Sequence, residues 1–281
     1  MGEERRDDDR RQRGKKAGGE SETMMASDLP ETWTAELILK GMDRNYMAGL
    51  CLCYSRRMMA YMQTVKFLQA KEREYFDTLQ FERRIKSYLA GRYAGKRAVS
   101  FLIGEEKPER VLIEHGIFHQ PVAVYPGSSK VQVSITHCDD LGAAIAFPEA
   151  VPMGIDIERI CPEKKDVLER QLTVREQDLA KSIPFAYETA LTLFWTVKES
   201  MSKVLKTGLT SSVGIFLIEK TEINDRVIVS HFVHFPQYCA ASFIFEPYIC
   251  SIAYPKRAVW ETGMVRDLLD DLSGLLKGGR V

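Results

Sequence analysis

A five-residue stretch at residues 154–158 constrains the fold of this chain more than any other segment. It reads Gly-Ile-Asp-Ile-Glu, so apolar and acidic side chains alternate. Alternation of this kind is typical of a strand, because successive side chains of a strand point to opposite faces. We therefore expect Ile155 and Ile157 to face a core, and Asp156 and Glu158 to converge on the other face.

A second stretch, residues 195–203, has helical spacing instead. It reads Trp-Thr-Val-Lys-Glu-Ser-Met-Ser-Lys, and Trp195, Glu199 and Lys203 fall at i, i+4 and i+8 along one face of a helix. This face therefore carries an acidic residue, Glu199, followed one turn later by a basic residue, Lys203.

Together these stretches supply the groups of a magnesium–phosphate site. Mg²⁺ is a hard ion that a few carboxylates hold and that substrate phosphate oxygens complete, and Asp156, Glu158 and Glu199 fit this description. Lys203 is placed to meet negative charge that develops on phosphate or on a departing oxygen.

Taken singly, each motif has an ordinary structural interpretation. An Asp-x-Glu is usually a solvated strand end, and a Glu–Lys pair is usually a surface bridge that contributes about 0.2–0.5 kcal/mol.

The conjunction of the two motifs resembles the paired signatures of the 4'-phosphopantetheinyl transferases of the surfactin and enterobactin type. Their patterns run Gly-[Val/Ile]-Asp-x-Glu and Trp-[Ser/Thr]-x-Lys-Glu-[Ala/Ser]-x-x-Lys, and this chain matches both at every position. Residues 134–138 (Ser-Ile-Thr-His-Cys) are similar to a strand end of the family. Arg84 with residues 89–92 (Leu-Ala-Gly-Arg) resembles its basic helix. The resemblance covers about residues 60–255.

The resemblance implies a specific reaction. Members move the 4'-phosphopantetheine arm of coenzyme A onto a serine of an apo acyl carrier or peptidyl carrier protein, with Mg²⁺, and release adenosine 3',5'-bisphosphate. Asp156, Glu158 and Glu199 would then hold the metal, and Asp156, Glu199 and Lys203 would form the catalytic group. Glu199 would relay the serine proton, and Lys203 would stabilise or protonate the leaving side.

The same resemblance implies the residues that bind coenzyme A. His137 would contact its phosphate oxygens, with Thr136 beside it as a hydroxyl donor; Arg84, Arg92 and Lys96 would supply charge from a basic helix. Independently of the family, His137 is expected at the end of a strand, where rigid scaffolds present binding groups. Basic residues on an amphipathic helix commonly just form its solvent-exposed face. This structural interpretation stays open for Arg84, Arg92 and Lys96.

Two positions depart from the family pattern. Many relatives have Gly-Lys-Pro where this chain reads His119-Gln120-Pro121, so Gln120 cannot supply the lysine charge. Cys138 replaces a serine that often follows the histidine. The resemblance therefore leaves open which residue replaces the lysine.

The order of predicted elements indicates an α+β fold of two pseudo-symmetric halves, each a small antiparallel or mixed sheet packed on a long helix, with coenzyme A between them. We expect a disordered charged tail over residues 1–30, an N-terminal half over 31–148 and a C-terminal half over 149–257. A C-terminal helix follows over 258–281. Between the motifs, residues 172–193 are placed to dock the carrier, although most of their apolar side chains are expected in the core. Residues 96–99 and 198–201 have a short sequence similarity, which is consistent with two related halves.

Composition excludes some classes of function. With 39 basic and 39 acidic residues the formal net charge is zero. We therefore do not expect an overall positive electrostatic potential that would attract nucleic acid or membranes. The six cysteines show no zinc spacing. No apolar run of about 18 residues occurs, and we expect no signal peptide. We expect a cytoplasmic protein, and by analogy with the family a monomer.

Two other functions remain open at this point. A metal-dependent phosphoesterase could use the same carboxylates to activate water in place of the carrier serine. A non-catalytic relative could hold coenzyme A or a carrier without chemistry.

Overall fold

The computed structural model describes residues 29–41, 43–126, 130–208 and 212–278. The tail expected over residues 1–30 lies outside these ranges except for its last two residues. The fold is α+β, with antiparallel sheets and, among the described residues, seven α-helices.

A first sheet of five strands has the order β12-β1-β2-β6-β5, and its neighbours are antiparallel. The alternating and apolar sequences of these segments favour strands because one or both faces are buried. The bounds are β1 Glu31–Lys40, β2 Asn45–Tyr54, β5 Val131–Cys138, β6 Leu141–Pro148 and β12 Val259–Trp260.

A second antiparallel sheet has the order β7-β11-β10-β9-β8, and β3 and β4 form a separate hairpin. The edge strand β7 spans Gly154–Arg159 and contains the Asp-x-Glu motif. The other bounds are β3 Leu112–His115, β4 Pro121–Val124, β8 Ile218–Asn224, β9 Val227–Phe232, β10 Tyr238–Phe245 and β11 Tyr248–Pro255.

Two long helices carry the remaining motifs. Helix α3 spans Glu82–Ile103 and holds the basic stretch, and α6 spans Tyr187–Val204 and holds the Trp-to-Lys motif. The other helices are α1 Met58–Met62, α2 Ala70–Asp77, α4 Lys165–Arg170, α5 Val174–Ser182 and α7 Gly263–Gly278. Short 3₁₀ helices are η1 Gln63–Phe67, η2 Pro108–Arg110, η3 Pro162–Lys164 and η5 Val213–Phe216.

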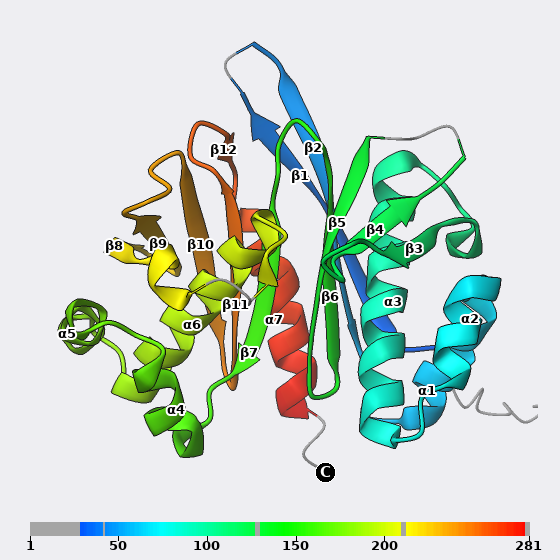
Figure 1. The fold of residues 1–281 in the computed structure, drawn as a ribbon, viewed down its shortest axis with the longest axis horizontal. Coiled ribbons are helices and arrows are strands. Elements are labelled where there is room, and N and C mark those ends of the chain that lie inside the picture. The colour runs from blue at the N-terminus through cyan, green and yellow to red at the C-terminus, as the bar shows by residue number, and fades with distance from the viewer. Residues whose placement is uncertain (1–28, 42, 127–129, 209–211, 279–281) are drawn as a thin grey trace, which may run out of the picture.

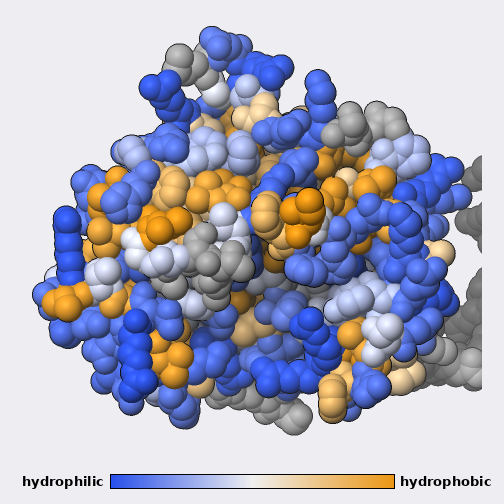
Figure 2. All heavy atoms as spheres, in the orientation of Figure 1, coloured by the Kyte–Doolittle hydropathy of each residue, from blue (hydrophilic) through white to orange (hydrophobic). Residues whose placement is uncertain are grey.

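The core forms layers around the two sheets. The central cluster joins residues of both sheets with the apolar face of α7; α7, red in Figure 1, runs between them. A second cluster lies between α6 and the second sheet, and a third between α3 and the first sheet. Figure 2, in the same orientation, shows a largely hydrophilic face crossed by apolar side chains above its centre. The two motif helices are thus each fixed to one sheet.

Most predicted elements are confirmed, with corrections at particular segments. The apolar sequence of residues 213–220 on its own predicts one strand, but Val213–Phe216 forms a 3₁₀ helix before β8. The sequence pattern does not predict strands β3 and β10. The C-terminal helix begins at Gly263, after the short strand β12. Within the described ranges, no helix combines the length and the apolar character that a membrane crossing requires.

Candidate active site

The two sheets meet at the edge strands β5 and β7 through side-chain hydroxyls. Ser134 Oγ accepts the Ile155 N–H at 3.1 Å, and Thr136 Oγ1 accepts the Ile157 N–H at 3.3 Å. An edge strand leaves such N–H groups unpaired, and the hydroxyls of β5 satisfy them. The polar residues of β5 therefore hold β7 in place.

Strand β7 also approaches α6 closely, and this explains the glycine that opens its motif. A Cβ at Gly154 would collide with the backbone carbonyl of Ser200 on α6. Ile155 and Ile157 enter the central core as expected, whereas Asp156 is only 5% exposed on the side facing α6. The alternation predicted for this strand is confirmed, and it brings the carboxylate of Asp156 to the helix.

Three carboxylates lie within electrostatic reach of one another at this junction. Burial, together with the nearby charges of Asp156 and Glu158, raises the pKa of Glu199 to about 7. Burial and then Asp156 raise the pKa of Glu158, which Lys164, Lys203 and the Trp195 indole oppose. Like charges held close together disfavour full ionisation, so the cluster attracts protons or cations.

Lys203 is the cation that contacts Asp156 of this cluster. Its Nζ donates to Asp156 Oδ1 at 2.8 Å and to the Ile155 carbonyl at 2.9 Å. Thr136 Oγ1 donates to the same Oδ1 at 3.0 Å. Thr136, which we expect to contact coenzyme A, is buried here and donates this hydrogen bond to Asp156.

The other oxygen of Asp156 lacks the contacts that Oδ1 makes. Oδ2 is buried and finds no hydrogen-bond partner among the described residues, an arrangement that costs free energy unless another group supplies the interaction. As the side chains stand, no three His, Cys, Asp or Glu residues in the described ranges are arranged to hold a metal ion. The donor chemistry of Asp156, Glu158 and Glu199 nevertheless fits a hard divalent cation.

The raised pKa of Glu199 predicts a pH-dependent stability. Its pKa is about 7 in the folded protein against 4.5 for the free side chain, so its stabilising contribution is complete below about pH 4.5 and is lost as the pH rises to about 7. Glu199→Gln should therefore gain stability relative to the wild type between pH 5 and pH 8. Urea unfolding without added divalent metal measures the difference. Glu261→Gln, at an exposed position, is the control; an equal difference at both pH values would contradict the prediction.

A cavity of about 1050 Å³ opens beside the carboxylates, at the ends of β5 and β7 and the start of α3. Arg84, His137, Glu158 and Lys164 line it. Burial, then the cations Lys203 and Arg84, lower the pKa of His137, so near neutral pH its imidazole is uncharged and can donate one hydrogen bond and accept another. The structure thus brings Arg84 and His137 to one cavity, together with Glu158.

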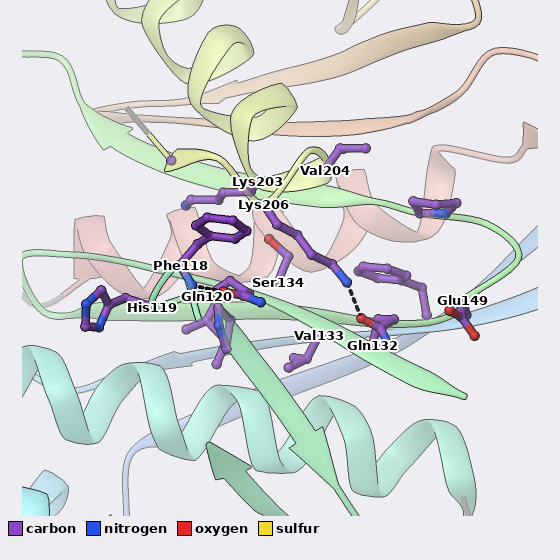
Figure 3. A pocket seen from close by; sticks show the side chains of 15 residues that line it. Phe118, His119, Gln120, Gln132, Val133, Ser134, Glu149, Lys203, Val204 and Lys206 are labelled. Atoms are coloured by element: carbon purple, nitrogen blue, oxygen red, sulfur yellow. Dashed lines mark hydrogen bonds between the residues drawn. The ribbon is translucent and has the colours of Figure 1, made fainter. Parts of the chain in front are cut away.

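A second cavity, of about 430 Å³, has Lys203 on its wall (Figure 3). Lys203 and Lys206 enter it from α6 and the turn after it, and Phe118 and Gln120 from the β3–β4 hairpin. Lys206 Nζ donates to Gln132 Oε1 at 2.7 Å, and Gln120 Oε1 accepts the Phe118 N–H at 2.9 Å. Gln120 therefore stabilises its own hairpin.

Arg92 and Lys96 lie further along α3, away from the carboxylates. Arg92 lines a separate cavity of about 310 Å³, where its Nη2 lies 2.8 Å from His115 Nε2 and its guanidinium stacks on Tyr88. Lys96 is fully buried and pairs with Glu72 at 2.6 Å. The structure therefore does not bring Lys96 to the surface of any of these cavities.

Several residues at this junction were missed by the sequence reasoning. Ser134 bridges the strands, Lys164 reaches within 3.9 Å of Glu158, and Lys206 lines the second cavity. The alternation of β5 could have singled out Ser134, because it shares a face with Thr136. Nothing in the local pattern distinguishes Lys164 or Lys206 from ordinary surface lysines.

Comparison with known proteins bears on the segment that contains this junction. Residues 152–253 match the family model described as the 4'-phosphopantetheinyl transferase superfamily. A search of curated proteins found no match to the chain. The matched segment contains Asp156, Glu158, Glu199 and Lys203, and it therefore carries a domain similar to the 4'-phosphopantetheinyl transferase superfamily.

Proposed function

We propose that this protein transfers the 4'-phosphopantetheine arm of coenzyme A to a serine of an apo acyl or peptidyl carrier protein, as a holo-[acyl-carrier-protein] synthase. The match to the superfamily supports phosphopantetheine transfer in general. The observation that carries the finer proposal is the gathering of Asp156, Glu158 and Glu199 near Lys203. Glu158 lines one cavity and Lys203 lines another.

In the proposed reaction the serine oxygen bonds to the phosphorus that bears pantetheine, and the bond from that phosphorus to the bridging oxygen breaks. Adenosine 3',5'-bisphosphate leaves. Glu199 accepts the serine proton, directly or through water. Lys203 stabilises the negative charge that develops on the leaving oxygen. The partly buried surroundings strengthen this electrostatic attraction.

The cavities suggest how coenzyme A lies. We place its phosphates in the cavity that Arg84, His137 and Lys164 line, because charge-assisted hydrogen bonds favour phosphate there. The uncharged arm lies in the cavity beside Phe118.

Asp156, Glu158 and Glu199 would hold Mg²⁺ at this junction. The metal would supply charge neutralisation for the diphosphate and keep its oxygens oriented. The partnerless Oδ2 of Asp156 supports this assignment, and Lys203 would have to release Oδ1 or share it.

We further propose that the enzyme belongs to the surfactin and enterobactin type, is monomeric and acts in the cytoplasm. Its two halves would be related by pseudo-symmetry, with α3 on one sheet and α6 on the other. Of residues 172–193, expected to dock the carrier, the apolar side chains are mainly core; Val174 and the nearby Val167 are exposed and could contact an apolar patch of the carrier.

Incubation with coenzyme A, Mg²⁺ and an apo carrier tests the proposal by intact-protein mass spectrometry. We expect the carrier to gain the mass of one phosphopantetheine arm, and EDTA to abolish the gain. Hydrolysis of coenzyme A without attachment would favour a metal-dependent phosphoesterase, and binding without either product would favour a non-catalytic relative. A panel of fatty-acid, polyketide and peptide carriers, with coenzyme A and acyl coenzyme A, then defines the substrate.

A further inference from the structure

A lysine next to Glu199 forms a buried ion pair that joins three segments. Lys198, one residue before Glu199 on α6, has no exposed side-chain surface, and its Nζ lies 2.8 Å from Glu176 Oε2. The same Oε2 accepts the Thr173 N–H at 2.9 Å at the start of α5, and Oε1 accepts the Ile218 N–H of β8 at 3.0 Å. The pair therefore ties α6 to α5 and to the second sheet.

An ion pair on α3 repeats these contacts one by one. Lys96 Nζ lies 2.6 Å from Glu72 Oε2, and both side chains are buried. This Oε2 accepts the Gln69 N–H at 2.9 Å at the start of α2, and Oε1 accepts the Ile113 N–H of β3 at 3.2 Å. Each lysine also donates to a backbone carbonyl, that of Val111 or that of Gln171.

The fit of each helix against its sheet repeats at the same position. A Cβ at Gly154 of β7 would collide with the carbonyl of Ser200, two residues after Lys198. A Cβ at Gly49 of β2 would lie 2.8 Å from the carbonyl of Ala98, two residues after Lys96. Both lysines therefore lie two residues before a close approach between helix and strand.

A buried ion pair is weak evidence for stability, since desolvation offsets the attraction, but it can specify one arrangement among several. The rotation of α6 matters here because a helix turns by about 100° and rises about 1.5 Å per residue. A small rotation would move Glu199 and Lys203 off Asp156. The ion pair, whose carboxylate oxygens all have partners, resists that rotation.

We propose that Glu176 and Lys198 are positioning residues that set the rotation of α6 and so aim Glu199 and Lys203 at Asp156. Glu72 and Lys96 do the same for α3 and its basic residues. The expected effect on catalysis rests on the proposed function, whereas the expected effect on the position of Lys203 relative to Asp156 does not.

The test replaces each pair by apolar residues of similar size: Glu176→Leu with Lys198→Met, and Glu72→Leu with Lys96→Met. Lys198→Met alone should unfold at a much lower temperature, because it leaves the Glu176 charge buried and unpaired; the double variant should recover most of this loss. The exposed pair Arg226–Asp270, changed to Gln and Asn, is the control and should leave every measurement unaltered.

Position and kinetics are then measured on the folded double variants. In a crystal structure of the α6 variant we expect the 2.8 Å contact between Lys203 Nζ and Asp156 Oδ1 to be lost, with kcat lowered by about 10²-fold and KM for coenzyme A little changed. The α3 variant should raise that KM with little change in kcat.

An α6 double variant that keeps both the contact and the wild-type kcat would overturn the proposal. If the wild-type protein transfers nothing, the proposed function fails, and the crystal contact alone decides the positioning role: loss of the contact supports it, and retention overturns it.

Discussion

Replacing Asp156 by alanine is expected to lower the rate of transfer by about 10³-fold, equivalent to about 4 kcal/mol. The carboxylate is 5% exposed, carries a buried oxygen without a partner and accepts bonds from Lys203 and Thr136. Its loss removes a central ligand of the proposed metal and the group that orients Lys203. The measurement is kcat with saturating coenzyme A, Mg²⁺ and apo carrier.

The fold should survive this change. Asp156 interacts repulsively with both Glu158 and Glu199, so its removal relieves like-charge repulsion, and Lys203, whose side chain is 24% exposed, can reach water. We expect the thermal midpoint to remain near that of the wild type. Circular dichroism and thermal unfolding check this expectation.

Asp156→Asn is the matched control for shape. The amide can still accept from Thr136 but loses the charge, so a deficit close to that of Asp156→Ala would assign the effect to charge. Near-normal activity of Asp156→Ala would remove this residue from the metal site, and with it the central claim of the proposal.

The secondary structure was predictable where one periodicity dominates a segment. The apolar spacing of α6 and α7 and the alternation of β7 are local properties. Helix α6 and strand β7 form where expected, and α7 forms with a later start, at Gly263. Strand β10 lies in the middle of its sheet and is buried almost throughout, so it shows no alternation. Its Ala-Ala-Ser centre also has weak strand propensity, and only pairing with β9 and β11 identifies it.

The candidate site was predictable in its acidic residues but less so in its supports. The motif spacing placed Asp156 and Glu199 on facing surfaces, which the packing of β7 on α6 brings together. It could not show that Thr136 donates to Asp156, because that contact depends on how two sheet edges meet. Nor could it show that Lys96 is buried against Glu72, since a lysine on a helix reads as solvated until a partner from another element is known.

Lys203→Ala should lower kcat by about 10²–10³-fold, the usual effect of removing one preorganised charged group at a reacting centre. Lys203 extends from the last turn of α6 to Asp156 Oδ1 and the Ile155 carbonyl, and it lines the second cavity. We also expect a loss of about 1–3 kcal/mol in the free energy of unfolding, because a buried carboxylate oxygen loses a charged partner.

The double variant Asp156→Asn with Lys203→Met separates the two effects of Lys203. It removes both charges together, so the buried site is left without an unpaired ion and the stability should recover, whereas the rate should not. Steady-state kinetics against coenzyme A and against the carrier, with urea unfolding, provide the measurements. If Lys203→Ala changed only KM for the carrier, Lys203 would be a docking residue and its role at the leaving oxygen would be wrong.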